Sequence, residues 1–207
     1  MEQNKQMHTP KQKRSIITRE KILKIALQLF CKNGYYKTST NEIAQTANIS
    51  IGNLYFYFKD KDMIFFEILN RYNQSFIKIH EKISKEMENY HGERKVLLRK
   101  LMEIMVQNHE ISKELNREIH ILCFSNPKVA AVMEKQQEQI EKIVMNYLLQ
   151  YKEQIKVQDI AAAATVTFAL LDSVVNLITF SKSKIDRKRI LTEAVNAVDK
   201  YLFGEIH

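Results

Sequence analysis

The stretch from Thr38 to Lys61 constrains the fold most, because two helix starts and a turn are written into it. Ser39 followed by Glu42 fits a capping box, in which the serine accepts a helical N–H and the glutamate reaches back to the cap. Asn48 stands where the chain must turn, and asparagine tolerates the left-handed conformation better than most residues. Ser50 is a good N-cap for a second helix. The pattern predicts short helices at about 40–47 and 51–57, joined by a tight turn.

The second short helix has an apolar side and a polar side. Leu54 and Phe58 lie four residues apart and are expected in the core, which leaves Asn53, Tyr55 and Tyr57 pointing outward. Amide and phenol groups bond base edges and phosphates, so this face suits a groove of DNA. An ordinary three-helix core with solvated polar residues would give a similar pattern. The two tyrosines and the nearby lysines favour the DNA interpretation over it.

Positive charge is concentrated in the same part of the chain. Residues 1–61 hold eleven Lys and Arg against four Asp and Glu, a net charge of +7 out of +8 for the whole chain, so residues 62–207 carry only +1. Such an asymmetry fits contact with a polyanion. A solvated basic tail would explain only part of the excess, because the segment stays positive without Lys5, Lys11, Lys13 and Arg14.

Residues 16–76 resemble the N-terminal domain of the TetR/AcrR family of transcriptional repressors. The shared features are a first helix ending in LF and NGY, the STNEIA and ANIS segments around the turn, and GNLYFYFKDK before a long helix. Asn48 departs from the family, which more often has glycine there. The resemblance implies an all-α, nine-helix fold. Its expected parts are a flexible basic tail (1–15), a DNA-binding domain (16–76) with its helix-turn-helix motif at 39–58, and a C-terminal ligand-binding and dimerisation domain (77–207).

The resemblance also implies which residues contact DNA. Gly52 would let the backbone approach closely, the two tyrosines would bond phosphates, and Lys61 would pair with a phosphate. The family's contact positions fall on Thr40, Asn41, Ile51, Gly52, Asn53, Tyr55, Tyr57 and Lys61.

The rest of the chain reads as long helices with few turns, since it has only four Gly and two Pro in total. Asn126 before Pro127 is a cap followed by a favoured first-turn proline. Asp186 and Gly204 are expected to begin and end the last helix. The expected helices span roughly 18–33, 40–47, 51–57, 60–88, 93–108, 111–124, 127–151, 158–181 and 186–203.

Residues 160–180 have the length of a membrane span, but Asp172 near their middle would cost ~3 kcal/mol of insertion energy. A buried helix of a soluble protein is favoured. Two apolar stripes predict two covers, the domain's own core and a second subunit, although both stripes could also pack within one chain. The resemblance implies a four-helix dimer contact made by the last two helices. The expected interface residues are Ala164, Phe168, Leu171, Val175, Ile178, Ala194, Val198 and Tyr201.

Signals for catalysis are weak, because no Walker loop, GxSxG elbow or HExxH motif is present. We therefore expect no enzyme and no cofactor. His120 and Cys123 are too few ligands for a zinc site, so no metal is expected. Two scattered cysteines and a polar N-terminus without an apolar signal segment favour a cytoplasmic protein.

Flexible methionines and aromatics mixed with isolated polar groups are typical of an adaptable apolar pocket, although the same residues often form plain core. Asp172 must be paired, protonated, or directed at a cavity or interface. The expected ligand residues are Met102, Met105, His120, Phe124, Phe168, Asp172 and Asn176. The hypothesis is a homodimeric repressor that a small hydrophobic or amphipathic inducer releases from a palindromic operator. The alternative is a DNA-binding dimer controlled by a protein partner.

Overall fold

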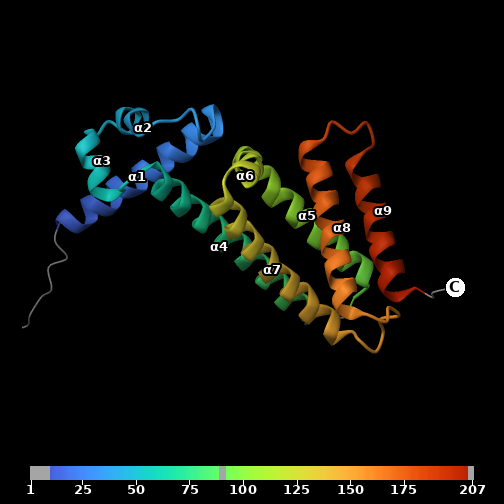
Figure 1. The fold of residues 1–207 in the computed structure, drawn as a ribbon. Helices are drawn as coiled ribbons and strands as arrows, with labels where there is room; N and C mark the ends of the chain where they lie inside the picture. Colours follow the sequence, from blue (N-terminus) through green and yellow to red (C-terminus); the bar gives the residue numbers. More distant parts are fainter. Residues whose placement is uncertain (1–9, 89–91, 205–207) are drawn as a thin grey trace, which may run out of the picture. The chain divides into compact units, whose positions relative to one another are not determined.

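The computed structural model describes residues 10–88 and 92–204, and all the regular structure assigned there is α-helical (Figure 1). The predicted all-α, nine-helix fold is confirmed for these residues. The helices are α1 (Pro10–Asn33), α2 (Thr40–Thr46), α3 (Ile51–Tyr57), α4 (Lys61–Glu88), α5 (Arg94–Ile111), α6 (Lys113–Ser125), α7 (Pro127–Gln150), α8 (Ile160–Phe180) and α9 (Arg187–Phe203).

The first helix begins earlier than predicted, at Pro10 rather than near residue 18. Proline suits the first helical turn, and the Lys, Gln and Arg that follow it are good helix formers. Residues 10–15 of the expected flexible tail are therefore helical. The rest of that expected tail, residues 1–9, lies outside the described residues.

The backbone divides into two compact units, with the boundary between Tyr72 and Asn73, inside α4. The first unit is built from α1, α2, α3 and the start of α4. Its core contains an aromatic cluster in which the Phe30 and Phe65 rings meet edge-on at 5.7 Å and Tyr35 lies 5.1 Å from Phe65. Leu54 and Phe58 are fully buried there, as their spacing predicts.

Ion pairs on the surface of the first unit join α1 to α4. Arg71 donates to both carboxylate oxygens of Glu20 at 2.6 and 2.7 Å, and Glu67 accepts from both Arg71 and Arg19. These side chains are partly exposed, so each pair contributes little free energy by itself, although the bidentate geometry favours the Arg71 pair. The network joins the start of α4 to α1 within the first unit.

The caps around the turn form largely as predicted. Ser39 accepts from the Glu42 N–H, Ser50 accepts from the Asn53 N–H, and Asn48 adopts a left-handed φ of 51°. The other half of the expected capping box is different, because the Glu42 carboxylate accepts from the Asn33 amide at 2.9 Å. That bond connects α2 to the end of α1 and so replaces a local cap with a tertiary contact.

The second unit packs α8 against α5, α7 and α9, and Figure 1 shows α8 and α9 side by side. Within the described residues, α8 is the one helix long and apolar enough to cross a membrane by length and composition. Its inner face instead joins two apolar clusters. One contains Met102, Val175 and Leu191, and the other contains Leu148, Ala164 and Val198.

The stripe of α8 predicted to face a second subunit is the inner one, which corrects that prediction. Ala164, Val175, Ala194 and Val198 are buried within the protomer, and Leu171 and Ile178 pack against the buried clusters. Two apolar stripes on one helix do not reveal which of them the chain's own helices cover, and α5 and α7 cover this one. Of the remaining predicted interface residues, Phe168 is half-buried and Tyr201 is exposed.

The end of the last helix also has a different cause from the one predicted. Gly204 terminates α9 with φ −73°, outside the left-handed region in which glycine is favoured. A Cβ at this position would lie 2.4 Å from the Lys200 carbonyl oxygen, so the absence of a side chain is what permits the ending.

Candidate functional site

The surface of α2 and α3 carries the residues predicted to contact DNA. Thr40 Oγ1 and the Tyr55 hydroxyl lie 3.0 Å apart, so the first residue of α2 and the middle of α3 present one pair of hydroxyl groups at the surface. Asn41 and Asn53 are exposed, and Tyr57 is half-exposed. These donors and acceptors point to solvent from a rigid, capped turn, which is an arrangement that can bond phosphates and base edges without rearrangement.

The N-terminus of α3 is exposed on this surface. Ile51, Gly52 and Asn53 form its exposed first turn. A Cβ built on Gly52 would meet no atom of the protein within 4 Å. The fold itself therefore does not require glycine here. A residue without a side chain is useful at this place if another molecule must approach the backbone closely.

Lys61 has partners within the protein. Its ammonium donates to the carbonyl oxygens of Tyr35 at 2.8 Å and Thr38 at 3.0 Å, and it lies 4.2 Å from the centre of the Tyr35 ring. Burial lowers the pKa of Lys61, partly countered by Asp62. The lysine anchors the segment between α1 and α2. Its contact with a phosphate stays a prediction.

One exposed aromatic residue on α3 escaped the sequence argument. The Phe56 side chain is 78% exposed, and its ring meets Tyr57 edge-on at 5.1 Å. Its position, two residues after buried Leu54, places it off the core face, and the helical period could have identified it. An apolar ring held outward beside Tyr55 and Tyr57 adds contact surface to the same helix.

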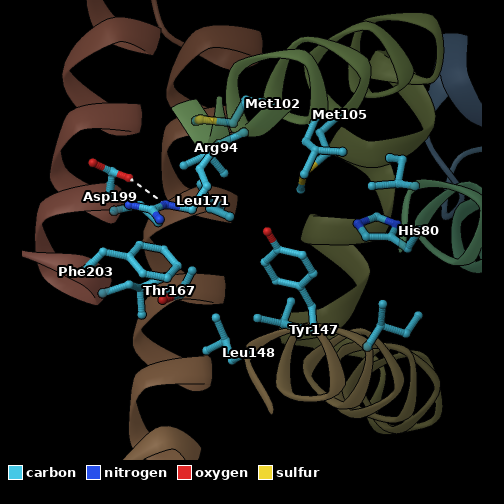
Figure 2. A pocket seen from close by; sticks show the side chains of 17 residues that line it. His80, Arg94, Met102, Met105, Tyr147, Leu148, Thr167, Leu171, Asp199 and Phe203 are labelled. Atoms are coloured by element: carbon cyan, nitrogen blue, oxygen red, sulfur yellow. Dashed lines mark ion pairs between the residues drawn. The ribbon is translucent and has the colours of Figure 1, made fainter. Parts of the chain in front are cut away.

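The second unit contains a partly open cavity of about 110 Å³ (Figure 2). Helices α4, α5, α7, α8 and α9 all contribute to its wall, which is mostly apolar. The lining side chains include Ile83, Leu98, Leu101, Met102, Met105, Ile143, Val144, Tyr147, Leu148, Thr167, Leu171, Val198, Leu202 and Phe203, with His80, Arg94 and Asp199 as the charged or titratable members.

The charged members of the wall are paired with each other. Arg94 Nε lies 3.6 Å from one Asp199 oxygen, and Lys95 Nζ lies 3.6 Å from the other. The Arg94 guanidinium also stacks 4.2 Å from the centre of the Phe203 ring. Figure 2 shows this pair on one side of the cavity and His80 on the other, with Tyr147 between them. The charged side chains on this side of the cavity therefore neutralise one another.

Two buried histidines lie near each other in this unit. His80 bonds the Phe76 carbonyl oxygen through Nδ1 at 2.9 Å, and the His109 ring lies 5.4 Å from the Phe76 ring. Burial lowers the pKa of both imidazoles, to about 4 for His109, where His80 and His120 lower it further and Asn176 opposes the shift. Both rings are therefore neutral near pH 7. Among the residues that the structure describes, neither nitrogen of His109 has a hydrogen-bond partner.

Unpartnered buried polar atoms are concentrated in the second unit. Within the described residues, all the buried side-chain N and O atoms that lack a hydrogen bond lie in this unit, on Asn73, His80, His109, Thr167, Asn176 and Thr179. Such atoms are uncommon in native proteins and call for an explanation, such as a bound water or ligand. His80 and Thr167 also line the cavity.

The structure brings only part of the predicted ligand set to the cavity. Met102 and Met105 line it, whereas His120 is exposed and Phe124 is 93% exposed, which corrects their predicted place in a pocket. Helical spacing alone did not show that α6 turns these two side chains outward.

The other three members of the predicted set lie on α8 away from the cavity wall. Phe168 is half-buried, and Asp172 accepts from the Asn176 amide at 2.9 Å. Burial raises the pKa of Asp172, with His120 and Asn176 acting in the opposite direction. Asp172 is therefore paired along its own helix. The prediction omitted His80, Thr167 and Tyr147, which line the cavity. The available signal was that each is an isolated polar side chain among apolar residues of its helix.

Comparison with known proteins places the first unit in a family. The model of the bacterial regulatory proteins of the tetR family matches residues 22–68. The chain is 52% identical over 52 residues to the HTH-type transcriptional regulator QacR of Staphylococcus aureus, an alignment that covers 25% of this chain and 28% of that protein. The chain thus spans about a quarter of the length of this relative, and the similarity lies in the N-terminal part.

Solved structures match over most of the chain. One is a protein of Mesorhizobium loti assigned to the TetR family of transcriptional regulators, with a TM-score of 0.73, 22% identity, and coverage of 91% of this chain and 96% of that one. Another is a regulator from Saccharomonospora viridis solved in complex with choline, with a TM-score of 0.65, 16% identity, and coverage of 89% and 96%. The TM-scores show that these proteins share the fold of this chain.

Proposed function

Because its N-terminal unit makes this chain a member of the TetR family, we propose that it is a homodimeric transcriptional repressor that acts in the cytoplasm. Two copies of the α2–α3 surface would enter successive major grooves of a palindromic operator, about 34 Å apart. A small, largely apolar inducer in the second unit would release the dimer from DNA.

The observation that carries this proposal is the exposed first turn of α3. Gly52 leaves the backbone open, Asn53 offers an amide to a base edge, and the Thr40–Tyr55 hydroxyl pair lies on the same surface. The positive excess of residues 1–61 adds attraction for phosphates. The fold leaves room for a side chain at Gly52. A surface that contacts only solvent would therefore not need glycine there.

An open groove on α8 and α9 supports the dimer. Its apolar lining is Leu170, Val174, Ile185, Ile190, Ala194 and Ala197, with Lys188, Arg189, Thr192 and Glu193 beside them, and Val166 and Leu177 are exposed on α8. An exposed apolar face of this kind marks an interaction site. A second copy of the same two helices would cover it in a four-helix contact. This groove replaces the inner stripe as the proposed interface.

The cavity supports the inducer. A ligand that favours one arrangement of the dimer lowers DNA affinity through a coupling of about 1–3 kcal/mol. A solved protein of this fold holds choline, so a small molecule can be bound within such an architecture. Control by a protein partner is the second candidate, and the exposed apolar side chains of Ile121 and Phe124 on α6 favour it.

The test is selection of random-sequence duplexes with the purified protein, followed by sequencing and sedimentation of the complex. The proposal expects an enriched inverted repeat bound by two copies of the chain. An enriched site without two-fold symmetry, or a complex with one copy, would contradict the proposed dimer. Small molecules that leave DNA affinity unchanged would shift the control to a protein partner.

A further inference from the structure

The protonation of His80 is determined by its contacts. Nδ1 lies 2.9 Å from the Phe76 carbonyl oxygen, which can only accept, so Nδ1 carries the hydrogen. Burial lowers the pKa of the ring, and it is neutral near pH 7. In a neutral imidazole with Nδ1–H, Nε2 is an acceptor. His80 therefore offers a lone pair.

Among the residues that the structure describes, that lone pair has no partner. Nε2 of His80 is buried without a hydrogen bond there, and His80 lines the cavity. Figure 2 shows it entering from α4, opposite the Arg94–Asp199 pair. An acceptor taken from water and left unbonded destabilises the folded state, and a ligand N–H or O–H would remove that cost. A ligand with a hydrogen-bond donor at this end of the cavity would therefore be favoured.

The rest of the wall disfavours a charged ligand. Asp199 is held by Arg94 and Lys95, and Arg94 is also covered by Phe203. A cation would have to compete with two basic side chains for Asp199, and an anion would have to take Arg94 from Asp199. The remaining lining is apolar, where an unpaired charge is costly.

The volume of this partly open cavity indicates how large a group it can hold. The cavity of about 110 Å³ is somewhat smaller than the apolar cavity of about 150 Å³ that accommodates benzene in another protein. Met102 and Met105 lie in the wall, and their unbranched side chains can shift to fit a ring. A body of about one six-membered ring is the natural occupant.

Thr167 supplies a second polar anchor. Among the described residues its buried hydroxyl has no hydrogen-bond partner, and Thr167 lines the cavity. A hydroxyl both donates and accepts, so it can serve a second polar atom of the ligand. Thr179, also on α8, is buried and unpartnered as well but does not line the cavity, and it offers a matched control.

We infer that the cavity binds an uncharged, single-ring ligand that donates a hydrogen bond to Nε2 of His80, as a phenol or an aryl alcohol would. This inference rests on the proposed function only in placing the inducer in this cavity. Direct binding to the protein without DNA tests the ligand chemistry. Release of DNA tests the function.

The experiment uses the full chain and four probes that each have a single aromatic ring: p-cresol, toluene, p-toluate and benzyltrimethylammonium, measured by calorimetry at pH 7. We expect p-cresol to bind at least about ten-fold more tightly than toluene, since only p-cresol satisfies the buried acceptor. The two ions should bind more weakly than p-cresol. Tighter binding of either ion or of toluene, or no binding by all four, overturns the inference.

Three variants locate the contact. His80→Leu should abolish the preference for p-cresol over toluene while toluene still binds, because the acceptor is lost and apolar lining is kept. Thr167→Val should alter p-cresol binding, whereas Thr179→Val should leave it unchanged. An undiminished preference in His80→Leu overturns the inference, and the Thr167 and Thr179 pair reports on the same cavity if His80→Leu does not fold.

The ligand chemistry and the inducer function can fail independently of each other. If p-cresol binds through His80 but leaves operator affinity unchanged, the ligand chemistry stands and the inducer function fails. If p-toluate or benzyltrimethylammonium releases the operator while p-cresol does not bind, the function stands and the ligand chemistry fails.

Discussion

The two units differ in where their unsatisfied chemistry lies. In the first unit, the described side chains bury no polar atom without a partner; Thr38, for example, is buried and donates to the Gly34 carbonyl oxygen. Its free donors and acceptors are outside, on α2 and α3. In the described part of the second unit, seven buried side-chain atoms lack partners, and α8 and α9 form an exposed groove with apolar side chains.

This difference indicates two kinds of binding. A preformed polar surface that needs no change in its own interior suits a partner of constant shape, such as a DNA groove. An interior with unpartnered acceptors and flexible methionines suits a small molecule that completes it. The first unit satisfies its own described buried polar groups. The second unit has unpartnered buried atoms and an exposed groove that other molecules can bind.

The largest expected effect tests whether each unit has its own core. Leu54 is fully buried, and Leu54→Ala should destabilise the first unit by about 2–5 kcal/mol, whereas truncation of exposed Phe56 should cost far less. Amide hydrogen exchange should show lost protection in α2 and α3 and retained protection in α8. Equal loss of protection in both units would break the comparison.

The second effect concerns the outer face of the second unit. Leu177→Arg would place a charge in the proposed contact between copies and should weaken dimerisation by several kcal/mol. Val96 on α5 has a similar exposure, and Val96→Arg is the matched control. Sedimentation should show monomers only for Leu177→Arg. A fully dimeric Leu177→Arg protein would move the interface elsewhere.

The third effect is a pH dependence that belongs to the second unit. The pKa of His109 is lowered to about 4 by burial, with His80 and His120 nearby, so the unfolded chain binds a proton on this residue between about pH 6.5 and 4 while the folded chain does not. The free energy of unfolding should therefore fall as the pH drops through this window, by at most about 3 kcal/mol.

His109→Leu should flatten the fall in that window, measured by urea unfolding at several pH values. The first unit responds at lower pH, because bonds to Arg71 and Arg19 lower the pKa values of Glu20 and Glu67, and their stabilisation is lost only below the ordinary carboxylate range. An unchanged slope between pH 6.5 and 4 in His109→Leu would show that other groups cause the acid sensitivity.

The sequence predicts the first unit better than the second. Caps such as Ser50 and the left-handed Asn48 are local rules, and each is read within a few residues of chain. The buried pair Leu54 and Phe58 follows from helical period. The sequence does not predict the tertiary contacts of this unit. These are the hydrogen bond from Asn33 to Glu42 and the bonds from Lys61 to backbone carbonyl oxygens.

In the second unit, the positions of the helices along the chain follow from breakers such as Asn126 and Pro127. The breakers do not show which face of each helix is buried. An apolar helix such as α8 fits its neighbours in more than one rotation, and the period alone does not choose between them. This is why Val175 was assigned to the dimer face and Phe124 to the pocket. The cavity depends on residues from five helices, including His80 and Thr167, which no local pattern brings together.

The central claim is that the first turn of α3 is a preformed surface for DNA, and Gly52→Ala tests it most directly. The methyl group meets no protein atom, and alanine favours helix over glycine by up to about 1 kcal/mol, so the melting temperature should not fall. Affinity for the selected duplex, measured by fluorescence anisotropy at fixed salt, should fall about ten-fold, equivalent to about 1.4 kcal/mol. Wild-type affinity in a stably folded Gly52→Ala protein would contradict the account.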